Sequence, residues 1–545
     1  MKKTLLLFCG MLMSFSMQAA DFESAKDAVK NMGVGWNLGN TLDAADASKT
    51  WTTTAQHETC WGQPVTKPEL MKMMKDAGFG AIRVPVTWYQ EMDKDGKVND
   101  AWMNRVKEVV DYVIDNGMYC IINVHHDTGD GKQWLHASTT NYDTNKAKYE
   151  YLWKQIAEKF KDYGQKLLFE AYNEMLDDNN KWNEPASDDG YKAINSYAKS
   201  FVTTVRNTGG NNKDRNLVVN TYSASSTPDA MKNLDLPEET GHIIFQLHSY
   251  PNWKSESNAK SEIDNLINNI KQNLQNRAPV IIGEYATFTT WPADVDYYNK
   301  DKEVALYAMD YMVKKAKENG IGTFYWMGLS DGIYRSEPAF NQADLAETLI
   351  KAYYGSSENY KFPTHDSSKG TVAFEGEKTL EWGQGVTVPA SMLKEVGKQV
   401  EVELSYKLDF LNFEKKDDQY CDIQFMYNKG GWQKIPSGLS MDSKAFEGAD
   451  FHPDEVYGIN SGDSKTSVLT FNDSAFELVA SNDLIIQGHG VIMTKVVVKA
   501  HETSGISNAL INKNSNDAIY NLNGQRISNP RKGIYIQNGK KYVMK

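Results

Sequence analysis

Two glutamates at the ends of apolar runs are the residues in this chain best suited to catalysis. Glu174 closes the run KLLFEAYNE, and Glu284 lies in PVIIGEY. Glutamate is rarely buried without a partner, so these positions suggest a function, unless each strand simply ends in water. Two carboxyl groups on one rim, one protonated and one ionised, would support acid–base chemistry on a neutral substrate, as hydrolysis of a glycosidic bond requires.

Short apolar runs alternate with segments of helical periodicity between residues 30 and 355, and these elements must position the two glutamates. The runs are 34–39, 81–86, 118–124, 166–173, 216–222, 242–250, 279–285 and 322–328. Several of the helical segments end at a glycine, as helices commonly do. Runs that are apolar on both faces are typical of a parallel sheet covered by helices, and eight of them predict an α/β fold, a (β/α)8 TIM barrel.

Polar and aromatic residues gather at the ends of these runs, where a barrel of this kind carries its chemistry. They are Asn40, Arg83, His125, His126, Asn173, His248, Tyr250 and Trp326. We expect Asn173 to hydrogen-bond the 2-hydroxyl of a sugar and the Trp326 ring to stack on one. Arg83 and Tyr250 are placed to keep a neighbouring carboxylate ionised, because a positive charge or a donor lowers its pKa.

Other catalytic arrangements lack their sequence signatures. His125, His126 and Asp127 could contribute to a metal site, but adjacent strand residues point to opposite faces and no further ligand stands at a recognisable spacing. No GxGxxG opens a helix in GVGWNLGN, and no G-x-S-x-G is present. We therefore expect neither a metal nor a cofactor.

The length, charge and N-terminus indicate the class of protein. A chain of 545 residues predicts two or more domains, and a formal net charge of −12 argues against a nucleic-acid partner. Residues 1–20 have the pattern of a secretory signal peptide, and no other stretch approaches the length of a membrane span. Cys60, Cys120 and Cys421 remain after processing, which is no disulfide framework. We expect a monomer that is secreted or held at the cell surface.

Seven short motifs occur in order along the first part of the chain. They are GWNLGNTLDA (35–44), RVPVTW (83–88), INVHHD (122–127), FEAYNE (169–174), HSY (248–250), IIGEY (281–285) and FYWMG (324–328). Together they resemble glycoside hydrolase family 5, most of all its bacterial endo-β-1,4-glucanases, over about residues 30–355.

The resemblance implies a barrel enzyme that retains anomeric configuration, with Glu174 as acid/base and Glu284 as nucleophile. Asn40 and His126 would be secondary substrate contacts, and the other six residues at the run ends would form the supporting shell. One departure is Met175, where many members have proline. This difference puts the detail of the subsites in question, but not the identity of the acid.

Three segments are predicted after the signal peptide. The catalytic barrel takes residues 21–357, and short alternating runs predict an all-β sandwich over 360–502. The sandwich is either a carbohydrate-binding module, with Trp382 and Trp432 as stacking candidates, or a spacer. Residues 503–545 form a linker and a β tail, which resembles C-terminal sorting segments of some Gram-negative secreted or surface enzymes; a folded extension of the sandwich is the alternative.

The activity implied by this resemblance is hydrolysis of internal β-1,4-glucosidic bonds of cellulose-type glucans, with a β-glucan polysaccharide as partner. Xyloglucan, mixed-linkage glucan or mannan could replace cellulose, and a barrel that binds glycan without cleaving it is a hypothesis of another class. A retaining pair requires carboxyl groups about 5–5.5 Å apart and pKa values moved in opposite directions, with Glu284 ionised and Glu174 protonated. Stacking candidates along an open cleft are Trp51, Trp61, Trp134, Trp182, Trp253 and Trp291.

Overall fold

The computed structural model divides the chain into two compact units, Met1–Asp366 and Ser367–Lys545. It describes residues 22–49, 51–129, 133–238, 241–250, 254–289, 295–364, 370–500, 519–520, 526–527, 533–537 and 540–544. The predicted signal peptide, residues 1–20, lies outside the described residues. The division between the units follows the predicted barrel segment, which was expected to end at residue 357.

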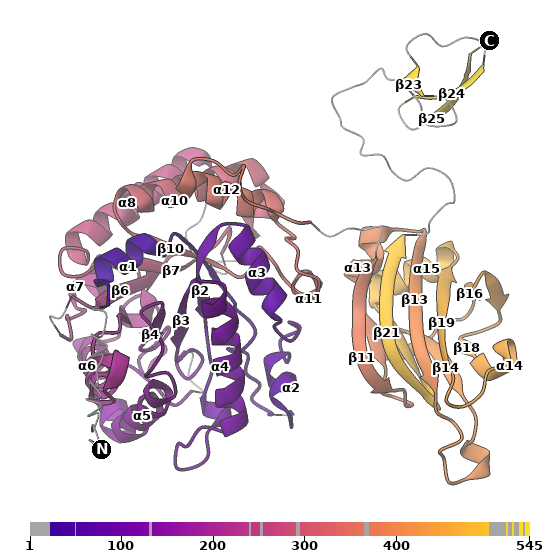
Figure 1. Cartoon of the computed structure of the whole chain (residues 1–545), viewed down its shortest axis with the longest axis horizontal. Coiled ribbons are helices and arrows are strands. Elements are labelled where there is room, and N and C mark those ends of the chain that lie inside the picture. The colour runs from indigo at the N-terminus through magenta and orange to yellow at the C-terminus, as the bar shows by residue number, and fades with distance from the viewer. Residues whose placement is uncertain are drawn as a thin grey trace, which may run out of the picture. The chain divides into compact units, whose positions relative to one another are not determined.

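The first unit is built around a closed barrel of parallel strands, so the predicted fold is confirmed (Figure 1). Its strands are β1 (Val34–Asn37), β2 (Phe79–Val84), β3 (Tyr119–Asn123), β4 (Leu167–Glu170), β5 (Leu217–Asn220), β6 (Ile243–His248), β7 (Val280–Tyr285) and β10 (Gly322–Trp326). Their order around the barrel is β1-β10-β7-β6-β5-β4-β3-β2. The barrel is closed because β1 pairs with both β10 and β2. Seven of the predicted apolar runs contain one of these strands, and the run 81–86 overlaps β2, which begins two residues earlier.

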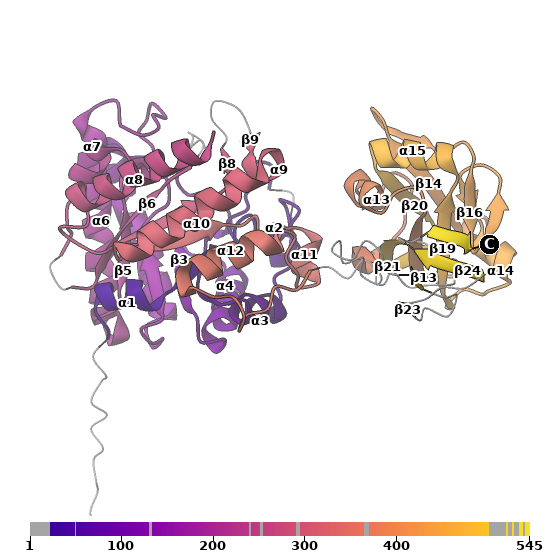
Figure 2. The ribbon, with the colours of Figure 1, turned by 90° about the horizontal axis from the view of Figure 1, so that it is seen from above.

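Amphipathic helices cover the outside of the barrel. The longer ones are α1 (Ala25–Asn31), α3 (Pro68–Asp76), α4 (Asp100–Asp115), α5 (Thr139–Lys159), α6 (Asp188–Asn207), α8 (Glu256–Asn273), α10 (Lys302–Glu318) and α12 (Ala343–Tyr354), and the shorter ones α2 (Thr54–Glu58), α7 (Pro228–Lys232), α9 (Tyr297–Lys300) and α11 (Ile333–Ser336). The Ser138 side chain accepts a hydrogen bond from a backbone amide in the first turn of α5, and Ser255 does the same for α8. Helix α12 ends at Gly355, which has a φ of 85°. Figure 2 shows α8, α10 and α12 side by side along one flank of the barrel.

Two apolar layers hold the barrel together. The larger lies between the strands and the helices, and includes Trp36, Trp102 and Trp153. The smaller fills the lower barrel interior and joins Ile121, Leu168 and other inward residues to the buried face of α1. One end of the barrel is therefore closed by α1, and the polar residues must lie toward the carboxyl ends of the strands.

The second unit has the predicted antiparallel sandwich. Its strands are β11 (Thr371–Thr379), β12 (Val386–Val388), β13 (Val400–Leu408), β14 (Asp422–Asn428), β15 (Trp432–Lys434), β16 (Leu439–Met441), β17 (Lys444–Phe446), β18 (Asp450–Phe451), β19 (Ser464–Phe471), β20 (Leu484–His489) and β21 (Val491–Ala500), with helices α13 (Ala390–Val396), α14 (Pro453–Tyr457) and α15 (Asp473–Asn482). One sheet has the order β11-β21-β13-β19-β16-β17, and the other β12-β20-β14-β15 with β18 beside β14. The inward residues of both sheets form a separate hydrophobic core, as the alternation of buried residues along β13 illustrates.

The tail contains a small antiparallel sheet of order β23-β22-β24-β25. Its strands are β22 (Ile519–Tyr520), β23 (Arg526–Ile527), β24 (Gly533–Gln537) and β25 (Lys540–Met544). The Asn-Gly pairs at which turns were predicted lie between these strands, outside the described residues. None of the helices in the described part of the chain is both long enough and apolar enough to span a bilayer.

The barrel unit also contains a two-stranded antiparallel ribbon outside the barrel, formed by β8 (Phe288–Thr289) and β9 (Val295–Asp296).

Candidate active site

A polar layer inside the barrel forms the floor of the site. Side chains alternate along each strand between the barrel interior and the helices, so residues two apart share a face. The lower inward positions, such as Ile121 and Leu168, are apolar. Two residues further along, the same faces carry Asn37, Arg83, Asn123, Glu170, Asn220 and Gln246, all fully buried.

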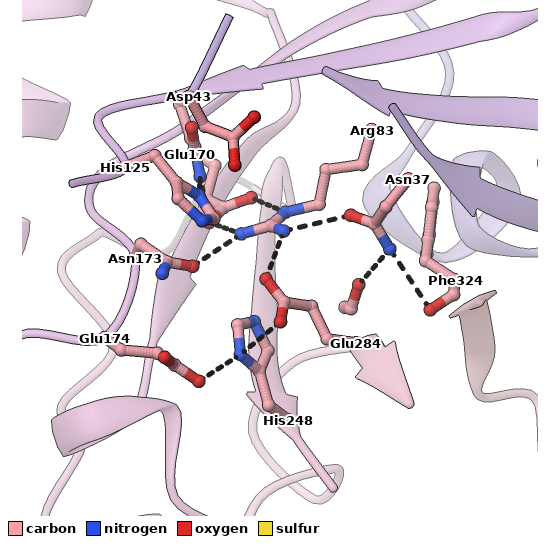
Figure 3. Close-up of polar contacts among 12 residues, drawn as sticks. Asn37, Asp43, Arg83, His125, Glu170, Asn173, Glu174, His248, Glu284 and Phe324 are labelled. Atoms are coloured by element: carbon pink, nitrogen blue, oxygen red, sulfur yellow. Dashed lines mark hydrogen bonds and ion pairs between the residues drawn. The ribbon is translucent and has the colours of Figure 1, made fainter. Parts of the chain in front are cut away.

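Arg83 lies at the centre of this layer (Figure 3). Its Nε and Nη2 donate to the two oxygens of Glu170, each at 2.7 Å, and Nη1 donates to Glu284 Oε1 at 2.7 Å. Nη1 and Nη2 also donate to Asn37 Oδ1 at 3.0 Å and Asn173 Oδ1 at 2.8 Å. Burial alone would lower the pKa of Arg83, but the two carboxylates raise it, so the guanidinium stays charged.

Glu170 was not predicted as a site residue, although it is the principal partner of Arg83. Burial opposes its ionisation, yet the Arg83 charge holds the pKa of Glu170 below its usual value. Asn123 and Asn220 also donate to Glu170 Oε1, at 3.1 Å and 3.3 Å. A signal was present in the sequence: Glu170 lies two residues after Leu168, on the inward face of β4.

Glu284 stands on β7 above Arg83 and is 4% exposed. Besides the bond from Arg83 to Oε1, it accepts one from the Tyr250 hydroxyl to Oε2 at 2.6 Å. Burial raises the pKa of the Tyr250 hydroxyl well above its usual value, and the Glu284 charge adds to that effect. Tyr250 therefore stays protonated and can only donate to this carboxylate.

Glu174 follows β4 and its side chain is 24% exposed, so it faces the open side of the barrel. Its Oε1 lies 2.8 Å from Nδ1 of His248, which is also 3.5 Å from Glu284 Oε2 (Figure 3). Burial lowers the pKa of His248 to about 4, so this imidazole is neutral at neutral pH. An oxygen of Glu174, an oxygen of Glu284 and a nitrogen of His248 all lie within 4.8 Å of one another.

The pKa values of the two glutamates are not moved in opposite directions, which corrects the prediction. Burial raises the pKa of Glu174 to about 7, and burial also raises the pKa of Glu284. The groups differ in the opposing interactions: the Arg83 charge and the hydrogen bond from Tyr250 counteract the rise at Glu284, and both residues donate directly to it. The pKa values of the two glutamates therefore differ in how far they are raised, and Glu174 is the better suited to carry a proton near neutral pH.

His125 and His126 lie together at the end of β3, where their rings meet edge to face at 4.5 Å. The expectation that they point to opposite faces is wrong, because both follow the last strand residue, Asn123. His125 is buried and its ring is parallel to that of Trp326, with centroids 5.9 Å apart. Burial lowers the pKa of His125 well below its usual value.

Asp43, His125 and His126 offer ligand atoms within 4.8 Å of one another, as do Glu174, His248 and Glu284. Asp43 is already bonded by the backbone amides of Asn40 and Thr41, at 3.1 Å and 2.8 Å. The Asn40 backbone has a φ of 60°, which turns the chain after β1 across the rim of the barrel.

The six tryptophans proposed as subsites differ in their positions. Trp51 is 7% exposed, stacks on His57 at 4.3 Å and donates to Glu91 at 2.9 Å, so it belongs to the core and not to a cleft. Trp61 is 42% exposed, with its ring 5.2 Å from that of His126. Trp134 is partly buried and donates to Asp127 at 2.7 Å. Trp182 is 52% exposed, and Trp253 and Trp291 lie outside the described residues.

A groove of about 960 Å³ extends from Glu174 away from the Arg83 floor. Its lining comprises Glu174, Trp182, Asn183, Ser223–Pro228, His248, Ser249, Tyr250, Glu262, Asn265, Leu266 and Asn269. The groove is hollowed between the loops after β4, β5 and β6 and the helix α8. Exposed Trp61 and the Trp326 ring stand elsewhere on the rim, next to the histidine pair.

Comparison with known proteins identifies the family of this barrel. The profile of the family described as Cellulase (glycosyl hydrolase family 5) matches residues 45–331. Endoglucanase B of Neocallimastix patriciarum is 36% identical over 323 residues, which cover 56% of this chain and 64% of that protein. The chain thus spans less than two thirds of that relative.

Two solved structures are similar to the same part of the chain. A GH5-4 broad specificity endoglucanase from an uncultured bacterium is 57% identical, with a TM-score of 0.60, covering 61% of this chain and 96% of that one. PbGH5A, a family 5 enzyme from Prevotella bryantii solved as a mutant with a xyloglucan tetradecasaccharide, is 42% identical, with a TM-score of 0.58 and coverages of 61% and 99%. The chain belongs to the cellulase family, glycosyl hydrolase family 5.

Proposed function

We propose that the barrel hydrolyses internal β-1,4 bonds of a β-glucan with retention of anomeric configuration. The observation that carries this proposal is the carboxyl pair, with oxygens of Glu174 and Glu284 within 4.8 Å. Carboxyl groups of retaining glycosidases stand about 5–5.5 Å apart, whereas inverting enzymes need about 6.5–9.5 Å to admit a water. The unequal hydrogen bonding of the pair supports separate roles for the two groups.

In the first step a carboxylate oxygen of Glu284 attacks the anomeric carbon. The bond from that carbon to the glycosidic oxygen breaks, and the Glu174 proton passes to the leaving oxygen. A glycosyl ester of Glu284 and an ionised Glu174 remain. In the second step Glu174 removes a proton from water, whose oxygen attacks the anomeric carbon and releases Glu284 as a carboxylate.

The supporting residues are bonded in ways that suit these steps. The Asn173 oxygen accepts from Arg83, so its amide nitrogen is left to donate, which fits a contact with the sugar 2-hydroxyl. Arg83 and Tyr250 hold Glu284 in one orientation before attack, and Glu170 fixes Arg83 from below. Preorganised donors of this kind need little rearrangement during the reaction.

His248 can hold Glu174 in both of its protonation states. Its Nδ1 lies 2.8 Å from Glu174 Oε1 and 3.5 Å from Glu284 Oε2. With the imidazole proton on Nδ1, it donates to Oε1 both when the other oxygen of Glu174 carries the catalytic proton and when the group is ionised, so no change of tautomer is needed. The side chain keeps its position while the carboxyl group changes charge.

The substrate class that we propose is a β-1,4-linked glucan of the cellulose type, including its branched and mixed-linkage forms. The groove beside Glu174, of about 960 Å³, is lined by polar residues and the exposed Trp182 ring. The similar PbGH5A structure contains a xyloglucan fragment. A mannan, or binding without cleavage, is the competing function, and both catalytic carboxyl groups argue against the latter.

Secretion or display at the cell surface completes the proposal. Residues 1–20 have the signal-peptide pattern and the final segment resembles a sorting tail. Expression in a Gram-negative host, followed by mass measurement of the exported product, tests both processing steps. An unprocessed protein confined to the cell interior would contradict this part of the proposal.

Hydrolysis of a polymer panel tests the activity itself. We expect a rapid loss of viscosity in soluble cellulose derivative, mixed-linkage glucan or xyloglucan, with few reducing ends released early. Release of a disaccharide alone from the first minutes would exclude internal cleavage. A matched preparation of Glu284→Gln should release nothing, and activity in that variant would exclude Glu284 as nucleophile.

A further inference from the structure

The two outer faces of the C-terminal sandwich differ in their chemistry. On the six-stranded sheet, the outer face carries ion pairs between strands, such as Lys499 with Glu403 at 2.6 Å and Lys495 with Glu375 at 3.5 Å. That pattern is ordinary for a sheet face in water. Among the described residues, the outer face of the five-stranded sheet carries amides, a carboxyl group, apolar side chains and one imidazole along β14 and β20, and the ion pair of Lys434 with Asp450, at 2.9 Å, lies on the neighbouring strands β15 and β18.

This second surface, the β14–β20 face, consists of three cross-strand pairs: Asp422 with His489, Gln424 with Gln487, and Met426 with Ile485. The intervening residues Ile423, Phe425, Leu484 and Ile486 belong to the sandwich core, so the pairs point outward. Polar side chains on an outer sheet face are usually exposed, yet Asp422, Gln424 and Gln487 are only 6–7% exposed. The face is therefore recessed among its neighbours.

A chain of hydrogen bonds crosses the β14–β20 face and fixes its amides. The Gly383 backbone N–H donates to Gln487 Oε1 at 2.8 Å, and Gln487 Nε2 donates to Gln424 Oε1 at 2.6 Å. Gln424 Nε2 in turn donates to Asp450, which also accepts from Lys434 at 2.9 Å. Each carboxamide nitrogen carries two protons and uses one here, so each amide keeps a donor for a ligand.

A buried acceptor on the same face has no partner within the described part of the chain. Asp422 Oδ1 makes no hydrogen bond, and the Nδ1 atom of the His452 ring lies 3.8 Å from it. Burial raises the pKa of Asp422 to about 6. An unsatisfied buried oxygen is costly, and because Oδ1 is covered by protein, Asp422 places negative charge beneath the face and is not itself a contact for a ligand.

Two exposed aromatic rings flank the polar pairs. Trp382, in the turn that precedes Gly383, is 45% exposed, and Tyr420 is 40% exposed. Tyr420 is held in place, because it stacks on His489 at 4.4 Å and His489 stacks on Phe413 at 4.3 Å. The surface thus offers flat apolar rings next to fixed amide and carboxyl groups.

We propose that the β14–β20 face binds a neutral polysaccharide chain, and the identification of that chain as β-glucan rests on the proposed function of the barrel. A pyranose ring has an apolar face, which suits Trp382 and Tyr420, and hydroxyl groups, which both donate and accept. Hydroxyls can accept from the glutamine amides, whereas an anion would be repelled by the carboxylates of Asp422 and Asp450. The acidic chain, with a net charge of −12, also disfavours an anionic polymer.

The test compares retention of full-length variants in native gels that contain soluble mixed-linkage β-glucan. All carry Glu284→Gln and Trp326→Ala, which stop turnover and weaken the barrel's own contacts with the polymer. We expect Trp382→Ala and Tyr420→Ala each to raise the Kd by about tenfold or more, a loss of about 1.4 kcal/mol. Lys407→Ala, an exposed position on the opposite sheet, is the matched control and should bind as the parent does. Equal retention of all four proteins would overturn the proposal.

Further measurements separate the alternatives. Trp382→Phe, which keeps a ring, should retain most of the binding; a complete loss there would indicate a structural role and contradict the proposal. If Trp382→Ala instead abolished a concentration-dependent dimer without changing retention, the face would be a self-association surface. Hydrolysis of a short soluble oligosaccharide by Trp382→Ala in the otherwise unchanged enzyme should be normal, so a failure of the barrel's proposed activity is scored separately from a failure of glycan retention.

Discussion

Replacing Tyr250 by phenylalanine removes one hydrogen bond from Glu284 and leaves the rest of the site in place. The Tyr250 hydroxyl, which stays protonated, donates to Oε2 at 2.6 Å, and the ionised carboxylate has no proton to donate in return. A hydrogen bond to a charged group contributes about 1.5–3 kcal/mol, and about 1.4 kcal/mol corresponds to one pKa unit. Because Arg83 still donates to Oε1 at 2.7 Å, we expect the lower end, a rise of about one unit in the pKa of Glu284.

The direction in which Tyr250→Phe shifts the pH profile follows from the ionised form of Glu284, which is the form that reacts. Glu284 attacks as a carboxylate, and the lost donor stabilised that carboxylate, so its pKa rises and the acid limb of kcat/KM moves to higher pH. Below that limb the rate should fall about tenfold. The assay uses an aryl cellobioside with an activated leaving group, whose cleavage depends least on the Glu174 proton.

A matched control is Tyr149→Phe, which removes a buried hydroxyl that donates to the Ala171 carbonyl at 3.0 Å and touches no carboxylate. Its acid limb should coincide with that of the unmodified enzyme. An acid limb that stays in place in Tyr250→Phe, or that moves to lower pH, would refute the assignment of Tyr250 as the donor that keeps Glu284 ionised.

Four further substitutions test the roles of other residues. Glu174→Gln should cripple polymer cleavage but still form the glycosyl-enzyme from an activated aryl glycoside, and added azide should speed its turnover; no response to azide would count against the acid/base role. Glu170→Gln should lower the free energy of unfolding by about 3–5 kcal/mol in urea titrations, because it breaks a buried ion pair with Arg83, and an unchanged midpoint would contradict that pairing. Trp51→Ala should destabilise by about 3–5 kcal/mol. Trp182→Ala should leave stability within about 0.5 kcal/mol and raise KM for polymers, and the reverse pattern for the two tryptophans would refute their placement.

The barrel was predictable because parallel strands covered by helices are apolar on both faces. Each of the eight runs overlaps a strand and ends at that strand's last residue or a few residues beyond it, and Glu174 and Glu284 stand at two of these carboxyl ends. Arg83 could be named for a different reason: a charged residue within an apolar run needs a buried partner. The sequence did not reveal that its main partner is Glu170.

Apart from Arg83, the residues of the polar floor were not predicted, because they lie inside the strands and not at their ends. Glu170 lies within the run 166–173, before the strand end that predicted Glu174. Counting in steps of two from Leu168 would have placed Glu170 on the inward face, and the same count places Asn37 and Asn123 there. The two-residue alternation of side chains along a strand therefore identifies inward-facing residues that the composition of the run does not.

The other differences between prediction and structure depend on side-chain packing, which the spacing of residues in the sequence does not encode. Trp51 stacks on His57 inside the core, and its position could not be separated from that of exposed Trp182 by residue type. The pKa of Glu284 depends on burial as much as on Arg83, and burial is a property of the closed barrel. His125 and His126 meet because the strand ends before them, which moves them out of the alternation of β3.

The central claim, that Glu284 attacks the sugar while Glu174 supplies the proton, can be tested by trapping the intermediate. Incubation with an activated 2-deoxy-2-fluoro cellobioside slows the second step, and mass spectrometry of the intact protein and its peptides locates the adduct. The account predicts one added glycosyl group, on the peptide that contains Glu284, and products of the uninhibited reaction with retained configuration. An adduct on Glu174, or an inverted product, would contradict it.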